Sequence, residues 1–237
     1  MLRCCFRPAF TLAEVLITLG ILGVVSAMTM PVLIQKHNRR VVETRLKKFY
    51  SSINQAILMA ENDFGDKRDW YQDLKNSEID GEGNPIEGTN EAEKWFNKYI
   101  APYMVIIKKE TLSDGAFLVY FPDGSALRPA TDFTRDWYFY PSNPKKCMDM
   151  YGVGYSPEGL GVCLFAFNFY PISDSDTWKY HYNKGMEPYK CSWTGDKNQL
   201  YKGSSNSCDT GSGLYCTAII QLNNWTIPDD YPRRIRN

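Results

Sequence analysis

The first pattern along the chain is an apolar run from Phe10 to Ile34, 25 residues that contain one ionisable group, Glu14. As a helix this run would be about 37 Å long, enough to cross a hydrocarbon layer about 30 Å thick. A cleaved secretory signal is the alternative, but the run is too long for one and ends without a convincing A-x-A cleavage site. We therefore expect a retained membrane anchor.

Beyond the anchor the pattern becomes amphipathic, from Gln35 to about Asn62. Apolar residues recur there at spacings of four, three, four and four, which places on one helical stripe Val42, Leu46, Phe49, Ile53 and Ile57. Pro31 interrupts the series, and a proline inside an apolar helix more often kinks the helix than ends it. The sequence predicts one helix from about residue 10 to 62, half in lipid and half packed on a globular head.

The rest of the chain is typical of a β-rich head. Asn90-Glu91-Ala92-Glu93 resembles a capping box and predicts a helix that runs to about Tyr99. Strands are expected at Val105–Lys109, Ala116–Phe121, Ala126–Arg128, Trp137–Tyr140 and Val162–Tyr170. The turn residues Pro122-Asp123-Gly124 join two of them in a hairpin. A polar stretch between residues 172 and 213 needs staples to stay ordered, and Thr217–Leu222 fits a short helix or a strand.

These segments predict an α+β fold, in which the second half of the long helix packs on an antiparallel sheet and the C-terminal region is rich in loops. Charge adds little, because 27 basic residues balance 27 acidic ones. That balance predicts no general attraction to nucleic acid or to anionic lipid.

The cysteines point to an oxidising compartment. Cys4 and Cys5 precede the apolar run, and the other five lie in the C-terminal half: Cys147, Cys163, Cys191, Cys208 and Cys216. No CxxC pair is present, so a zinc site of ordinary spacing is poorly supported and we expect no metal and no cofactor. Cysteines that follow a membrane segment in the sequence are better explained as disulfides in an oxidising compartment than as metal ligands.

The spacing of the cysteines predicts part of the disulfide pairing. Cys208 and Cys216 enclose a short Gly- and Ser-rich loop that can bend them together, so we expect them to pair. Cys147 with Cys163 is the expected second pair. Cys191 is then free, although it could replace a member of either pair.

The residues Ala9-Phe10-Thr11-Leu12-Ala13-Glu14, then Gly20 and Gly23, and then Pro31 resemble the N-terminal signature of type IV prepilins and type II secretion pseudopilins. In that family a short basic leader ends at a small residue, a phenylalanine follows, and a glutamate stands four residues later. Ala9 occupies the place of the usual glycine. The resemblance implies that a prepilin peptidase cuts between Ala9 and Phe10 and methylates the new amine of Phe10.

The resemblance implies a domain organisation and a role. Residues 1–9 are the leader, 10–34 the transmembrane half of the helix, 35–62 its amphipathic half, and 63–237 a pilin-like head. The protein would be a structural subunit, a pseudopilin or minor pilin, anchored by one span in the bacterial inner membrane with its head exported. Its partners would be the peptidase, other pilin-like subunits, an inner-membrane assembly platform and membrane lipid.

Glu14 has a chemical role to play in such a filament. A lone carboxyl in lipid is costly and normally has a partner. After cleavage, the Phe10 ammonium of a neighbouring subunit could pair with Glu14 inside a dry helical bundle and set the register. The alternative is a protonated Glu14 without a specific partner. Pro31 is the other residue of the signature expected to matter for assembly.

Other functions have weaker support. A single-pass anchored binding protein is the main alternative, and cleavage before Phe10 distinguishes the two. A DNA-uptake minor pilin would need a basic stripe, and no nucleic acid partner is expected. Asp174 and Asp176 lack the companions of a calcium loop, and His181 among aromatic residues fits packing better than a binding patch. No catalytic motif occurs, so an enzyme is not expected.

Overall fold

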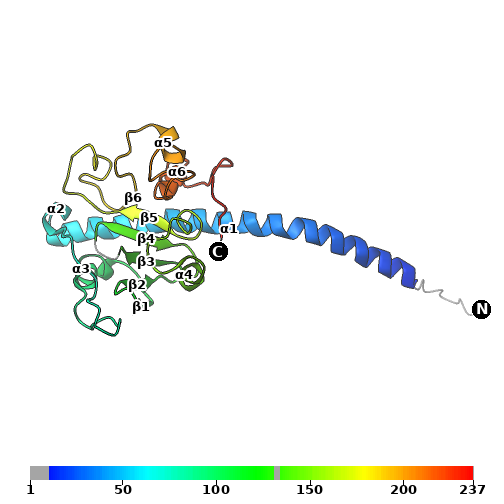
Figure 1. The fold of residues 1–237 in the computed structure, drawn as a ribbon, viewed down its shortest axis with the longest axis horizontal. Helices are drawn as coiled ribbons and strands as arrows, with labels where there is room; N and C mark the ends of the chain where they lie inside the picture. The colour runs from blue at the N-terminus through cyan, green and yellow to red at the C-terminus, as the bar shows by residue number, and fades with distance from the viewer. Residues whose placement is uncertain (1–10, 131–133, 237) are drawn as a thin grey trace, which may run out of the picture.

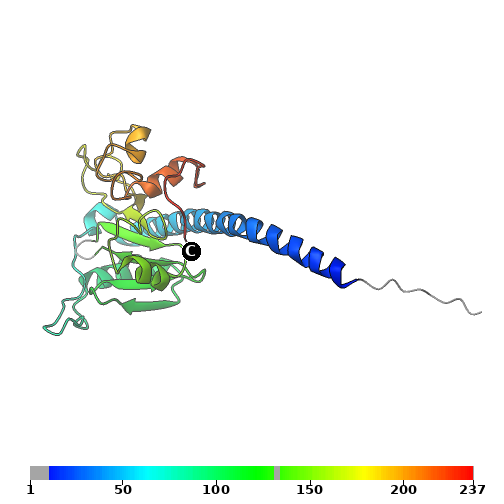
Figure 2. The same ribbon diagram turned by 45° about the vertical axis from the view of Figure 1, so that its right-hand side comes forward.

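The computed structural model describes residues 11–130 and 134–236. It has the expected α+β architecture, in which one long helix crosses an antiparallel sheet and projects far beyond it (Figure 1). The projecting part curves away from the axis of the packed part (Figure 2).

Helix α1 spans Leu12–Phe64 without a break at Pro31. The predicted stripe is confirmed, because its side chains are the ones that the second half of α1 buries, together with Ala56 and Ala60. Gly65 ends the helix with a φ of 82°, a conformation that glycine adopts without steric cost, and its N–H donates to the Glu61 carbonyl.

Six strands pair with their sequence neighbours in the order β1 to β6, all antiparallel. They are β1 (Lys108–Thr111), β2 (Phe117–Tyr120), β3 (Ala126–Pro129), β4 (Asp136–Tyr140), β5 (Phe165–Asn168) and β6 (Glu187–Pro188). The β2–β3 hairpin is confirmed, with the Gly124 N–H donating to the Phe121 carbonyl across the turn.

The two faces of the sheet bury different clusters because side chains alternate along a strand. Phe117 and Val119 of β2 belong to the cluster that contains the α1 stripe. Leu118, between them, joins a second cluster with Cys147 and Met148 of α4 (Pro144–Tyr151). The sheet is therefore a middle layer between α1 and α4.

The remaining elements are short: α2 (Lys67–Trp70), α3 (Glu91–Tyr99), the 3-10 turn η1 (Ala101–Tyr103), α5 (Lys197–Tyr201) and α6 (Cys216–Leu222). The α3 start is as expected, with the Asn90 side chain accepting from the Glu93 N–H at 2.7 Å. The segment Thr217–Leu222 proves to be helical. The first strand begins three residues later than expected, and Val105 and Ile107, which suggested it, are 73% and 63% exposed.

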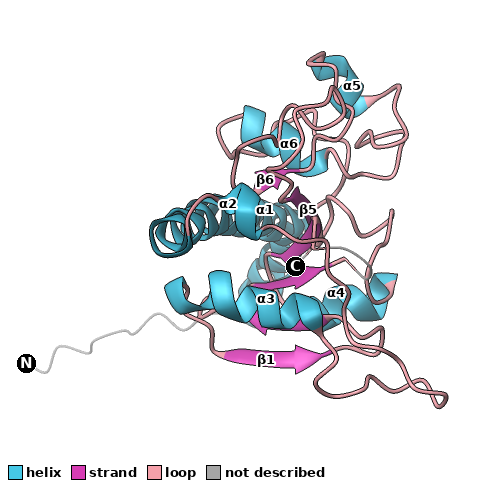
Figure 3. Ribbon diagram, turned by 90° about the vertical axis from the view of Figure 1, so that its left-hand side faces the viewer, coloured by secondary structure: helices cyan, strands magenta, loops and turns pink. Residues whose placement is uncertain are grey.

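The loop-rich C-terminal region has a small core of its own, on the side of α1 opposite β1 (Figure 3). Cys208 and Cys216 form a disulfide inside this core, and a second disulfide joins Cys147 to Cys163. These are the pairs expected from the sequence, and Cys191 is a free thiol.

Removal of the Cys208–Cys216 disulfide is expected to lower the free energy of unfolding of the head by about 2–3 kcal/mol, since the bridge restricts the unfolded chain. The variant is Cys208→Ala/Cys216→Ala, measured by urea unfolding of the detergent-solubilised chain. Cys191→Ala, which breaks no bridge, should change the value by less than about 0.5 kcal/mol. Peptide mapping without reductant that found both thiols free in the wild type would contradict this.

Candidate functional site

The projecting half of α1 is the most unusual surface of the molecule. Among the described residues, α1 is the one helix long and apolar enough to cross a membrane, and its most apolar stretch has a mean hydropathy of 2.1 with none of it buried in the head. Leu12, Leu16 and Leu33 are each about 60–80% exposed, at both ends of this stretch. A surface that apolar on every side of a helix requires lipid or other apolar helices around it.

Glu14 is the one charged side chain on this surface, and it lies in the first turn of α1. The Thr11 backbone N–H and hydroxyl each donate to Glu14 Oε2 at 2.8 Å. The Glu14 N–H donates back to Thr11 Oγ1 at 3.3 Å, which completes a capping box. The pattern Thr11-x-x-Glu14 carries this signal, but we did not predict the capping box from it.

The capping box determines how Glu14 meets a partner. The carboxylate satisfies donors that a helix end otherwise leaves without partners, and a carboxylate accepts more hydrogen bonds than these. The negative charge also sits at the positive end of the helix dipole. Glu14 is therefore held at the helix terminus, exposed, with capacity for a further donor. Ala9 and Phe10, the expected cleavage residues, lie outside the described residues.

Pro31 lies where α1 leaves the head. The helix faces of Pro31 and Ile34 line a groove of about 490 Å³ together with Met150 of α4 and Ile235 near the end of the chain. The C-terminal segment runs beside α1 at this point, so two parts of the chain that are far apart in sequence meet at the groove (Figure 1).

Hydrogen bonds fasten the C-terminal segment to α1. Arg39 donates through Nη2 to the carbonyls of Ile227 and Pro228, both at 2.8 Å. The Ile227 N–H donates to Glu43 Oε1, also at 2.8 Å. These residues are more than 180 positions apart in sequence. No local pattern pairs such distant residues, so sequence reasoning missed this contact.

A buried polar group forms a second tie between α1 and the C-terminal region. The Tyr50 hydroxyl of α1 donates to Glu187 Oε1 of β6 at 2.7 Å. Lys190 and Gln221 donate to the other Glu187 oxygen at 3.4 Å and 3.1 Å. Because buried polar groups need partners, this arrangement fixes where α6 sits against α1.

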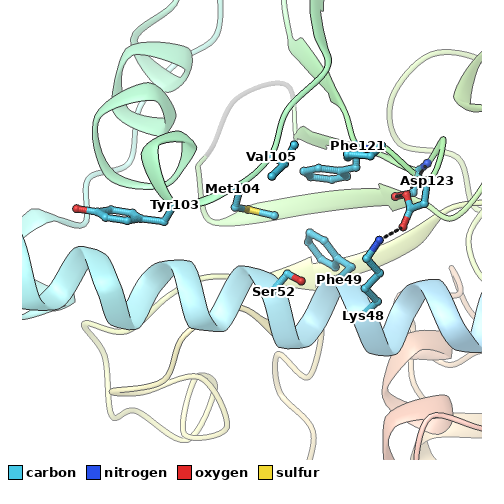
Figure 4. A pocket seen from close by; sticks show the side chains of 10 residues that line it. Lys48, Phe49, Ser52, Tyr103, Met104, Val105, Phe121 and Asp123 are labelled. Atoms are coloured by element: carbon cyan, nitrogen blue, oxygen red, sulfur yellow. Dashed lines mark hydrogen bonds and ion pairs between the residues drawn. The ribbon is translucent and has the colours of Figure 1, made fainter.

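A smaller groove of about 290 Å³ opens between α1, η1 and the β2–β3 turn (Figure 4). Phe49 and Met104 line its inner side, and Lys48 Nζ lies 3.0 Å from Asp123 Oδ2 at its rim. Partial burial opposes ionisation of Asp123, but hydrogen bonds from Ser125 and Lys48 lower its pKa below the ordinary value. The ion pair between Lys48 and Asp123 is a contact at the rim of the groove.

The weaker candidates from the sequence have structural settings. His181 is fully buried, and burial, with the charges of Lys190 and Lys184, lowers its pKa to about 3. Its neutral ring accepts from the Lys190 N–H, which is a packing role. Asp174 and Asp176 are exposed on a loop. Within residues 11–130 and 134–236, no group of three or more His, Cys, Asp or Glu side chains could hold a metal ion.

Comparison with known proteins places most of the chain in one family. The family described as "Family of unknown function (DUF6613)" matches residues 32–235, a range that begins one residue after Pro31 and covers all but the last two residues of the head. No curated protein matches the chain, and no solved structure matches it.

Proposed function

We propose that this chain, which belongs to the DUF6613 family of unknown function, is a structural subunit of an extracytoplasmic filament of the type IV pilus or type II secretion kind, and not an enzyme. One observation carries the proposal. A single continuous helix is exposed and apolar in its first half and forms the core of the head in its second half. A simple anchor would need no such rigid connection between membrane and head.

The geometry suits assembly by helix bundling. The exposed apolar halves of neighbouring subunits would pack together as they leave the lipid, while the heads form the outer surface. Glu14 would accept from the Phe10 ammonium of the next subunit, which fixes the axial register. Cleavage by the prepilin peptidase creates that ammonium, and an inner-membrane assembly platform adds each subunit to other pilin-like subunits.

The disulfides support the same location. Two bridges among the described residues suit an oxidising compartment, which supports a head exported from the cytoplasm. The protein would reside in the inner membrane with one span until it enters a filament. An anchored binding protein would share the span and the bridges, but it would need neither the cut nor the Glu14 charge.

We expect the mature protein to begin at Phe10 and to carry a methylated amine. Ala9→Leu should block the cut because the peptidase pocket fits a small residue, whereas Ala9→Gly should be cut at least as well as the wild type. Ala27→Leu, in the same apolar run but away from the cut, is the matched control and should be processed. Mass analysis of the membrane-bound chain decides, and an intact Met1 would refute the proposal.

A further inference from the structure

The charges of this neutral chain are segregated along the molecule. Residues 73–93 contain seven acidic residues and one basic residue, in the loop and helix at the end of the head remote from the projecting helix (Figure 1). Residues 32–48 of α1 contain six basic residues and one acidic residue at the end from which the helix projects. The net charge of zero predicts no general attraction to anionic lipid, but the molecule nevertheless has one basic end.

Exposed cations lie on α1 and beside it near the level where the helix leaves the head. Two lie on α1, one on α4 and two in the C-terminal segment, and we name them the basic collar: Lys36, Arg40, Lys146, Arg234 and Arg236. With the Gln35 amide oriented so that its oxygen faces Arg234, Arg234 donates to it through Nη2 at 2.6 Å, which ties the C-terminal segment to the helix.

The acidic groups near the collar are mostly engaged elsewhere. Glu43 accepts from the Ile227 N–H, and Asp229 lies 4.0 Å from Arg39, which is not part of the collar. Asp230 accepts from the Tyr201 hydroxyl at 3.4 Å. Asp149 is exposed on α4. Glu158 and Asp209 line a neighbouring groove with Arg234 and Arg236, and Asp209 lies 3.6 Å from Lys202. Arg233 lines the same groove, so with Arg39 and Arg233 added to the collar, seven basic residues face six acidic ones and this end of the head keeps a small positive charge.

The groove beside Pro31 supplies the other half of the site. Lys146, Arg234 and Arg236 line it together with apolar side chains: Met30, Pro31, Ile34, Met150 and Ile235. The helix surface below the groove is continuous with the exposed apolar half of α1. The apolar residues that α1 contributes to the groove lead toward the projecting half of the helix, whereas the three cations come from α4 and the C-terminal segment of the head. A phospholipid presents its acyl chain and its phosphate in the same order.

We propose that the basic collar and this groove bind the head group of an anionic phospholipid in the leaflet against which the head rests. Guanidinium groups match phosphate oxygens in a planar fork, and each Lys or Arg near an anionic membrane surface strengthens the attraction. The lipid acyl chain lies along Met30, Pro31 and Ile34. The inference requires α1 to lie in a membrane and is independent of filament assembly.

This site also accounts for a conflict in the sequence. Lys36, Arg39 and Arg40 follow the apolar run so closely that a count of positive charges alone would place the head in the cytoplasm. Arg39 is engaged with the C-terminal segment, and Lys36 and Arg40 belong to the collar. These three charges therefore have roles in binding the C-terminal segment and the lipid surface, and those roles do not depend on the direction in which the chain inserts.

The test is lipid selectivity of the full chain reconstituted in phosphatidylcholine bilayers. Electron spin resonance with trace spin-labelled phosphatidylglycerol or phosphatidylcholine measures which lipid the protein immobilises. We expect a several-fold preference for phosphatidylglycerol, which falls by at least half in Arg234→Gln/Arg236→Gln. Lys108→Gln/Lys109→Gln removes the same charge from strand β1 and should keep the full preference.

Three controls distinguish lipid binding from a folding defect and from plain charge attraction. Lys36→Gln/Arg40→Gln changes only exposed positions of α1 and should also lower the preference, so a folding defect in the arginine variant leaves the proposal testable. Free glycerophosphate should compete no better than sodium chloride of equal ionic strength. Equal immobilisation of both lipids by the wild type, or an equal loss in the β1 control, would overturn the proposal. So would salt-sensitive binding of polyglutamate without lipid preference, which would assign the collar to an acidic protein.

Discussion

Glu14→Ala is expected to insert into the membrane and to be cleaved, yet to be absent from filaments. The substitution removes the one charge from the apolar half of α1, so insertion becomes easier. In the filament it would leave the Phe10 ammonium of a neighbour in a dry bundle without its partner. Stranding one member of a buried pair costs about 3–5 kcal/mol, which corresponds to a loss of incorporation of more than about 100-fold.

The capping box calls for a control, because Glu14→Ala also removes a hydrogen-bond partner of Thr11. Thr11→Val deletes the hydroxyl that caps the helix and leaves the carboxylate in place. We expect it to enter filaments at nearly the wild-type level. Glu14→Asp keeps the charge with a shorter reach and should be intermediate.

Two assays on the same cells measure these variants, leader cleavage by mass and incorporation by shearing or cross-linking. If Glu14→Ala enters filaments as well as the wild type, the charge-pairing mechanism is wrong and the anchored binding protein gains support. If Thr11→Val fails as completely as Glu14→Ala, capping of the helix is what assembly needs.

Phe49→Ala should lower the free energy of unfolding of the head by about 3–5 kcal/mol, the cost of a large cavity in a core. The Phe49 ring stacks on Phe139 of β4 with centroids 4.3 Å apart and meets the Phe167 ring of β5 edge-on at 5.0 Å. It is 4% exposed, at the centre of the contact between α1 and the sheet. Its loss removes contacts from both layers at once.

Leu58→Ala is the matched control, since Leu58 lies on the same helix and is 60% exposed. It should change stability by less than about 0.5 kcal/mol. Urea unfolding of the full chain in detergent, followed by near-ultraviolet circular dichroism, reports on the head alone. A loss below about 1 kcal/mol for Phe49→Ala would mean that α1 is only loosely docked.

The long helix was predictable because its two signals are local and strong. A continuous apolar run and a stripe of period 3.6 need no knowledge of the sheet, and the expected bounds, residues 10 to 62, lie within two residues of Leu12–Phe64. Helix α4 also carries a local signal, since Asn143 caps it and Pro144 occupies its first turn. We missed it because the helix has only eight residues and its apolar face is short.

The rest depends on tertiary contacts that leave no local trace. Val105 and Ile107 look like strand residues, yet the pairing of β1 with β2 begins at Lys108, opposite Tyr120. Strand β6 has two residues and exists only because β5 offers an edge. At the candidate site, Glu14 stands out in the sequence as the one charge in the apolar run, whereas the basic collar needed a structure that brings Arg234 beside Gln35.

The hydrogen bonds that join Arg39 and Glu43 of α1 to Ile227 and Pro228 affect how the head folds during synthesis. They connect residues separated by 184 to 189 positions, so they can form only when nearly all of the head is present. Contacts so distant in sequence form late and slowly. While the chain is being synthesised, the stripe of α1 that the head later buries is made first and remains uncovered until the rest of the head is present. During that interval the head would be vulnerable to aggregation and proteolysis. A chaperone that protects the chain would bind the uncovered stripe of α1 at this stage.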